Sequence, residues 1–185
     1  MKIASIDIGM KNTMIVVFDV SSVILLTSTH RGSFKSTLIA NNFEVIESLS
    51  RLIEQVDVVI LEEQLGASNS KIHFNMLQNK FISGIVSGVI FGLKKHCYIS
   101  KPRLRQSTDL SELPKGVYHS DCTSYAHKRS KKISQLLFQF CSSNGSLVVA
   151  DEVELSKLMK MDDVFDCFAM LNEYLECEND FVIVN

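Results

Sequence analysis

The chain has 185 residues, of which 46% are hydrophobic and 22% charged, and its formal net charge is −2. This length suits one compact domain over residues 1–185, and the balance of apolar and charged residues excludes a disordered chain. The longest apolar stretch, residues 81–93, is shorter than the about 20 residues that a membrane-spanning helix needs, so we expect no membrane partner.

The near-neutral total hides a segregation of charge along the chain. Residues 94–132 hold 10 Lys and Arg against 3 Asp and Glu, whereas residues 133–185 hold 2 against 10. A basic segment beside an acidic one suits a protein that binds phosphates with one part and a metal ion with another. A solvated basic loop is the simpler alternative, and charge alone does not exclude it.

The five cysteines are isolated from one another and form no CxxC pair. An odd number without such pairs argues against a disulfide framework and against a zinc ribbon. We therefore expect reduced thiols and an intracellular, reducing compartment.

The first part of the chain alternates short β-rich runs with turns. Three such runs with short links predict an antiparallel meander, and helical spacing of apolar residues follows, with Asn41 or Asn42 as its expected cap. A short apolar run ending in Glu62 and Glu63 is consistent with a central strand. The expected strands span residues 3–8, 13–20, 23–29 and 56–61, and the helix spans residues 38–55.

The second part alternates helices with one more strand. The segment 102–124 is polar, holds both prolines and shows no periodicity, so we interpret it as an exposed insertion. The element order predicts an α/β fold: a mixed five-stranded sheet with the βββ meander and helices on both faces. Further helices are expected over residues 70–95, 125–141 and 162–177, and a fifth strand over residues 97–100.

Four carboxylates occupy positions that indicate a special role. Asp7 lies in an apolar strand between Ile6 and Ile8, where a lone carboxylate is costly unless it is paired or binds a metal. The other three carboxylates have simpler alternatives, as a strand-end surface charge, a helix-dipole partner or a solvent-facing acid. The other three are Glu62, at the end of a strand, and Asp163 and Asp166, which share a helix face.

Convergent carboxylates without His or Cys partners select hard, oxygen-preferring cations. The set therefore predicts Mg²⁺, with Mn²⁺ as a substitute, and two such ions are suited to phosphodiester cleavage.

Four segments carry a resemblance to a known family. The segment SIDIGMKN (residues 5–12) resembles the first-strand motif of the poxvirus and mitochondrial-type Holliday-junction resolvases, in which an Asp-x-Gly-x-Lys-Asn turn contains the catalytic aspartate. The segments VILEEQ (59–64) and MDDVFD (161–166) resemble their hydrophobic-Glu-x-Gln and Asp-Asp-x-x-Asp motifs, and YAHKRSKKI (125–133) resembles a basic run that opens the preceding helix.

The resemblance implies a RuvC-like enzyme with a ribonuclease H-like fold. Such an enzyme is a Mg²⁺-dependent endodeoxyribonuclease that cleaves four-way DNA junctions during recombination or repair; a viral enzyme of the poxvirus type would be cytoplasmic. The resemblance makes Asp7, Glu62, Asp163 and Asp166 the catalytic and metal-binding set. Bacterial RuvC has Gln directly after its Glu, which favours Glu63 instead, whereas strand alternation favours Glu62.

The family also implies DNA contacts and a homodimer. A basic residue of the Tyr125-containing segment is expected near the scissile phosphate, although the resemblance does not single one out. Three glycines four residues apart form a stripe that suits either packing against the sheet or a dimer interface, and the resemblance favours the interface. The candidate DNA contacts are Lys11, Lys128, Arg129, Lys131 and Lys132, and the candidate interface residues are Gly84, Gly88 and Gly92.

Three other functions remain open or are excluded. A ribonuclease H or an exonuclease has the same carboxylates, and a non-catalytic nucleic-acid-binding module leaves Asp7 unexplained. A phosphotransferase of the actin and sugar-kinase group also begins with an Asp-x-Gly turn, but it needs two such domains, for which 185 residues are too few.

Overall fold

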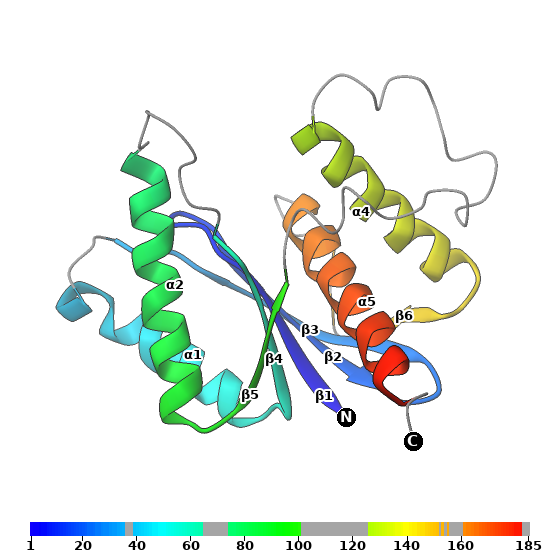
Figure 1. Ribbon diagram of the computed structural model, residues 1–185, viewed down its shortest axis with the longest axis horizontal. Coiled ribbons are helices and arrows are strands. Elements are labelled where there is room, and N and C mark those ends of the chain that lie inside the picture. The colour runs from blue at the N-terminus through cyan, green and yellow to red at the C-terminus, as the bar shows by residue number, and fades with distance from the viewer. Residues whose placement is uncertain are drawn as a thin grey trace.

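The computed structural model describes residues 1–35, 39–64, 74–100, 126–151, 153, 155 and 161–182. Its centre is a six-stranded mixed sheet with the strand order β5-β4-β1-β2-β3-β6 (Figure 1). The strands are β1 (Lys2–Asp7), β2 (Thr13–Val20), β3 (Ile24–Gly32), β4 (Val58–Glu62), β5 (His96–Ser100) and β6 (Leu147–Val149).

The first three strands form the expected antiparallel meander, and the next strands join it in parallel. β1 pairs antiparallel with β2, and β2 with β3, whereas β4 lies parallel to β1 and β5 parallel to β4. The carboxyl ends of β1, β4 and β5 therefore meet at one edge of the sheet, where side chains from separate parts of the sequence come together.

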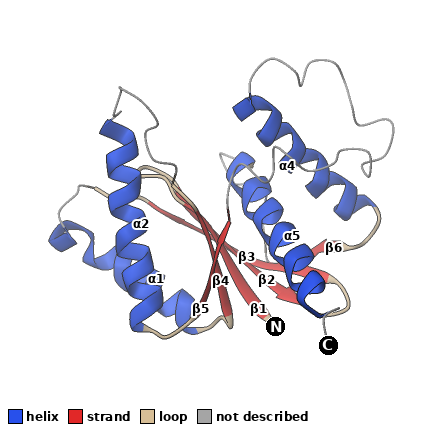
Figure 2. Ribbon diagram, viewed as in Figure 1, coloured by secondary structure: helices blue, strands red, loops and turns tan. Residues whose placement is uncertain are grey.

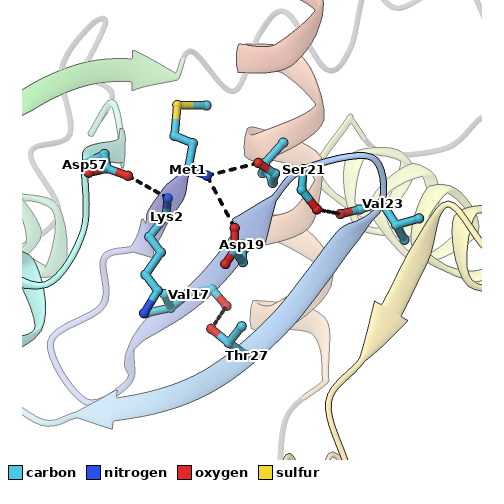
Figure 3. A network of polar contacts seen from close by, with 9 residues as sticks. Met1, Lys2, Val17, Asp19, Ser21, Val23, Thr27 and Asp57 are labelled. Carbon is cyan, nitrogen blue, oxygen red and sulfur yellow. Dashed lines mark hydrogen bonds and ion pairs between the residues drawn. The ribbon is translucent and has the colours of Figure 1, made fainter.

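Polar contacts hold the opposite end of β1 in place (Figure 3). The Met1 ammonium group lies 3.3 Å from Asp19 Oδ1 on β2, and the Lys2 backbone N–H donates to Asp57 Oδ2 at 2.8 Å. On the neighbouring strand, Thr27 Oγ1 donates to the Val17 carbonyl at 3.0 Å, next to an irregularity in the β2–β3 register. These contacts fix β1 relative to its neighbours and so fix where its carboxyl end lies.

Helices cover both faces of the sheet, as expected. α1 (Phe43–Glu54) and α2 (Phe74–Gly92) lie on one face, and α4 (Ala126–Ser143) and α5 (Asp162–Val182) on the other (Figure 2). Each helix pair closes its own hydrophobic cluster against the sheet. The α5 side buries Phe18 and Phe168, whose ring centroids are 6.1 Å apart.

Some sequence predictions about these elements are wrong in detail. The sheet has six strands and not five, because the three residues of β6 pair with β3. A 3₁₀ helix (Ile39–Asn42) replaces the first turn of the expected helix, and α1 begins at Phe43. Asn42 occupies the cap position without capping α1, since its Oδ1 accepts a hydrogen bond from the Lys35 N–H at 2.8 Å.

Further expectations concern two loops, the cysteines and membrane-spanning helices. The expected loop at 66–69 and the insertion at 102–124 lie outside the described residues. The cysteines in the described part of the chain, Cys97, Cys141, Cys167 and Cys177, are free thiols. Among the described helices, none is both long enough and apolar enough to cross a membrane.

Candidate metal centre

Asp7 is the last residue of β1 and lies on the α5 face of the sheet. Side chains alternate along this strand, so Ile3 packs in the cluster on the α5 side, whereas Ala4 and Ile6 pack on the α1–α2 side. Asp7 shares the face of Ile3 and is partly buried. Asp7 therefore closes the strand, whereas the sequence predicted a position within it.

Glu62 ends the neighbouring parallel strand on the same face. Ile60, two residues earlier, packs in the α5-side cluster, while Leu61 packs on the opposite side. Glu63 follows the strand and is exposed. The structure therefore brings Glu62, and not Glu63, next to Asp7, as strand alternation predicts.

Asp163 and Asp166 lie in the first turns of α5 and point back toward the sheet. Their side chains are buried, with relative exposures of 5% and 8%. Asp162 points elsewhere: its carboxylate is 55% exposed and lies 3.5 Å from the ammonium group of Lys131. Successive helical residues are turned by about 100°, which explains why adjacent aspartates differ so much in environment.

The other three carboxylates lie within electrostatic reach of Asp7. Burial raises the pKa of Asp7 well above its ordinary value of 3.8. The negative charges of Glu62, Asp166 and Asp163 raise this pKa further, as does a side-chain hydrogen bond between Asp7 and Glu62. Acids that are up to 159 residues apart in the sequence (Asp7 and Asp166) thus act on one another directly.

The donor chemistry of this cluster fits a hard divalent cation. All four side chains supply oxygen donors, and a cation would offset the repulsion that raises the pKa of Asp7. Over the described ranges of the chain, no three His, Cys, Asp or Glu side chains are grouped closely enough to form a ready-made ion site. The residues therefore fit a metal centre in chemistry and location, without a preformed coordination shell.

A tight turn follows Asp7 and shapes the space in front of it. A Cβ atom at Gly9 would lie 2.8 Å from the carbonyl oxygen of Asn12, so only glycine fits without a backbone shift. Thr13 Oγ1 closes the turn by donating to the Gly9 carbonyl at 2.8 Å. The glycine and the threonine thus hold the chain close to the carboxylates.

This turn forms one wall of a cavity of about 420 Å³. Asp7 and Asp163 line the cavity together with Lys11, whose side chain is exposed. Of the predicted DNA contacts with described side chains, Lys11 alone lines the same cavity as the carboxylates.

Two residues of this cavity were missed by the sequence analysis. Gln78 and Asn79 on α2 also line it, and both are half-buried. Nothing in the local sequence singles them out, because polar residues are ordinary in an amphipathic helix. Their place in the site becomes apparent only in the folded structure, where they line the same cavity as Asp7 at the end of β1.

The remaining predicted basic residues belong to α4. Lys131 pairs with Asp162, and Lys132 is exposed and donates to Gln135 Oε1 at 3.2 Å. Lys128 and Arg129 fall in the first turns of the same helix, but their side chains lie outside the described residues. Of the described basic groups, Lys131 thus lies at the start of α5 through its contact with Asp162, whereas Lys132 is exposed on α4.

The glycine stripe of α2 is open. A Cβ atom built at Gly84, Gly88 or Gly92 meets nothing within 4 Å, so the stripe does not pack against its own sheet. Phe91, beside Gly88 on the helix, is 86% exposed. Packing within the subunit, one of the two explanations of the stripe, is therefore wrong for the described part of the chain.

Solved structures share this architecture. The chain is similar to the fowlpox virus resolvase crystallised with Holliday junction DNA, with 23% identity over 96% of this chain and 98% of that one, and a TM-score of 0.61. The fold is that of the RuvC-like resolvases. RuvC of Thermus thermophilus is 12% identical over 96% of this chain and 97% of its own, with a TM-score of 0.61.

A third structure supports the same ribonuclease H-like fold. The yeast mitochondrial Holliday junction resolvase Ydc2 is 13% identical over 97% of this chain and 85% of its own, with a TM-score of 0.62. No protein-family model and no curated protein sequence matches the chain. The predicted ribonuclease H-like fold is thus confirmed, with a sixth strand added to the five expected.

Proposed function

We propose that this chain is a structure-specific endonuclease that cleaves four-way DNA junctions by divalent-metal-dependent phosphodiester hydrolysis. One observation carries the proposal: Asp7 and Glu62 end neighbouring parallel strands, and the buried Asp163 and Asp166 at the start of α5 lie within electrostatic reach of Asp7, on a resolvase fold. The structures with this fold are a fowlpox virus resolvase, bacterial RuvC and a yeast mitochondrial resolvase, and two were crystallised with junction DNA.

The four carboxylates are the proposed metal ligands, and Mg²⁺ is the proposed ion, with Mn²⁺ as a substitute. Two such ions, when bound, would activate a water molecule and stabilise the leaving oxygen. The chain itself holds Asp7 and Glu62 at the ends of paired strands and supplies Asp163 and Asp166 from a rigid helix. Lys11, on the same cavity, is suited to hold a phosphate as a point charge.

The proposed DNA surface continues from the cavity along α4. Lys131 lies beside the start of α5, Lys132 is exposed next to it on α4, and Lys128 and Arg129 belong to the preceding turn of the helix. Their charges would attract the phosphate backbone without reading its sequence.

A homodimer through the open stripe of α2 completes the proposal. A four-way junction has two-fold symmetry, so paired cuts require two matched active sites. Gly84, Gly88 and Gly92 leave the surface of α2 accessible to a second backbone, and the exposed Phe91 ring adds apolar area beside them.

A panel of substrates tests the function. The purified protein is incubated with Mg²⁺ and, in parallel, a synthetic four-way junction, a linear DNA duplex of the same sequence and an RNA–DNA hybrid. We expect paired cuts in the junction and at least tenfold slower cleavage of the other two. Preferred cleavage of the hybrid would favour a ribonuclease H, degradation from DNA ends an exonuclease, and tight junction binding without any cut a non-catalytic module.

A further inference from the structure

The cavity in front of the carboxylates has two chemically different walls. One wall is the turn after β1 with Asp7 and Lys11, and the other is formed by Gln78 and Asn79 of α2. The first turns of α2 stand beyond the ends of the central strands, so this helix reaches the cavity from the face of the sheet opposite α5 (Figure 1). A substrate that enters the cavity therefore contacts both layers of helices.

The two amides are available to a ligand. Gln78 and Asn79 are half-buried, and neither makes a hydrogen bond or an ion pair with any other part of the structure described. The third amide of the cavity, Asn12, is already engaged, since its Oδ1 accepts a hydrogen bond from Arg31. Amide groups that are both partly desolvated and unpartnered favour a ligand that offers donors and acceptors.

The remaining lining indicates what that ligand is. Ile8 and Met10 give the cavity an apolar surface beside the amides, and Lys11 and the carboxylates give it a charged end suited to a phosphate with its metal. A volume of about 420 Å³ is that of a small-molecule site and suits one nucleotide. Unstacked bases are recognised in proteins by this combination of apolar contact and hydrogen bonds to the base edge.

We propose that Gln78 and Asn79 are specificity-determining residues, whose amides bind the base of one unstacked nucleotide next to the scissile phosphate. The inference rests on the proposed function, because it assigns a further role within the same site. Lysine recognises a phosphate whatever the base, whereas an amide presents a fixed pair of donor and acceptor. The amides therefore make cleavage depend on the identity of one base.

The test measures base preference and not cleavage alone. Junctions with randomised nucleotides on both sides of the cut are digested with the wild type in Mg²⁺, and the products are sequenced to give a rate for each base. We expect a clear preference at one position. Gln78→Ala and Asn79→Ala should slow the cutting of the preferred sequence roughly 10- to 100-fold, the size of one lost bidentate base contact. Disfavoured sequences should change less than threefold.

Two further variants separate recognition from structure. Gln78→Glu replaces the amide donor with an acceptor and should shift the preferred base without abolishing cleavage. Gln55→Ala makes the same truncation as Gln78→Ala at an exposed site at the end of α1, and it should leave the preference unchanged. Thermal unfolding of each variant shows that the fold is retained.

The outcomes distinguish this inference from the proposed function. A wild type that cuts no junction contradicts the proposed function and this inference together. A wild type that cuts junctions without base preference, or a preference that survives in both alanine variants, overturns this inference alone. Equal slowing of all sequences would also overturn it, because it would make the two amides merely structural.

Discussion

Asp7 and Glu62 end two neighbouring parallel strands and share a side-chain hydrogen bond, although 55 positions separate them in the sequence. Two carboxyl groups can share such a bond only if one of them carries a proton. Burial and the nearby acids raise the pKa of Asp7 and so favour its protonated form. A divalent cation would replace that proton, which makes the pair the natural centre of the proposed metal site.

Replacing Asp7 should change how stability depends on pH. The pKa of Asp7 in the folded state is raised above its ordinary value of 3.8, so ionisation disfavours the fold. The contribution of Asp7 to the free energy of unfolding of the metal-free wild type should fall by about 1.4 kcal/mol per pH unit between the unfolded-state pKa and the raised folded-state pKa. Asp7→Asn lacks this contribution, so its stability relative to the wild type should rise with pH and then level off.

Chemical denaturation between pH 4 and pH 9 measures this difference. Asp151→Asn, at an exposed carboxylate, is the control and should follow the wild type at every pH. Added Mg²⁺ should stabilise the wild type and not Asp7→Asn. A constant difference between Asp7→Asn and the wild type across the pH range would contradict the raised pKa.

The three aspartates at the start of α5 should differ in importance. Asp163→Asn and Asp166→Asn remove buried carboxylates of the acidic cluster, and each should slow junction cleavage at least about 100-fold while leaving DNA binding intact. Asp162→Asn removes an exposed partner of Lys131 and should retain most of the activity. Single-turnover rates measure the effect. Equal losses at Asp162 and Asp163 would mean that the helix face is assigned incorrectly.

Neutralising the basic start of α4 should weaken DNA binding and flatten its dependence on salt. The variant replaces Lys128, Arg129, Lys131 and Lys132 together, and each lost phosphate contact should reduce the log–log slope by about 0.9. Binding titrations between 50 and 200 mM salt give the slope. The control is Lys94→Ala, an exposed lysine just after α2. An unchanged slope in the fourfold variant would show that these residues form a solvated helix surface.

Gly88→Leu should dissociate the proposed dimer without unfolding the subunit. A Cβ at this position meets nothing within 4 Å, and leucine favours a helix over glycine by about 0.8 kcal/mol, so the isolated subunit should gain stability. The bulky side chain would separate two backbones that approach along the stripe. Sedimentation of the wild type and the variant measures the association.

The control for this variant is Gln139→Leu, which adds the same side chain at an exposed site on α4. Paired cutting of a junction should fall more than single nicking in Gly88→Leu, and neither should change in the control. A monomeric wild type would contradict the dimer.

The helical spacing of apolar residues and their alternation along strands predicted most of the fold, because both patterns follow from which side chains are buried. The second strand, Thr13–Val20, was predicted to the residue, since its apolar run is bounded by turns on both sides. β6 was missed because three residues are too few for a pattern, and its pairing with β3 joins segments that lie 123 positions apart, as Ile24 and Leu147 do. The sixth strand is therefore a product of tertiary packing.

Some residues of the candidate site were likewise predictable from the sequence, and others were not. Asp7 was predictable because a carboxylate is unexpected in an apolar strand, and strand alternation favoured Glu62 over Glu63. Gln78 and Asn79 were not predictable, because polar amide side chains are ordinary in an amphipathic helix. Their role depends on where α2 lies relative to the end of β1, which is a property of the fold and not of the local sequence.

The most direct test of the central claim maps incisions on one synthetic four-way junction with each strand end-labelled. The wild type and Asp7→Asn are compared in Mg²⁺ and in EDTA, with junction binding measured in parallel. We expect symmetric cuts in two opposing strands for the wild type in Mg²⁺ only, and no cuts by Asp7→Asn, which should still bind the junction. Cleavage by Asp7→Asn at the wild-type rate, or wild-type cleavage in EDTA, would contradict the account.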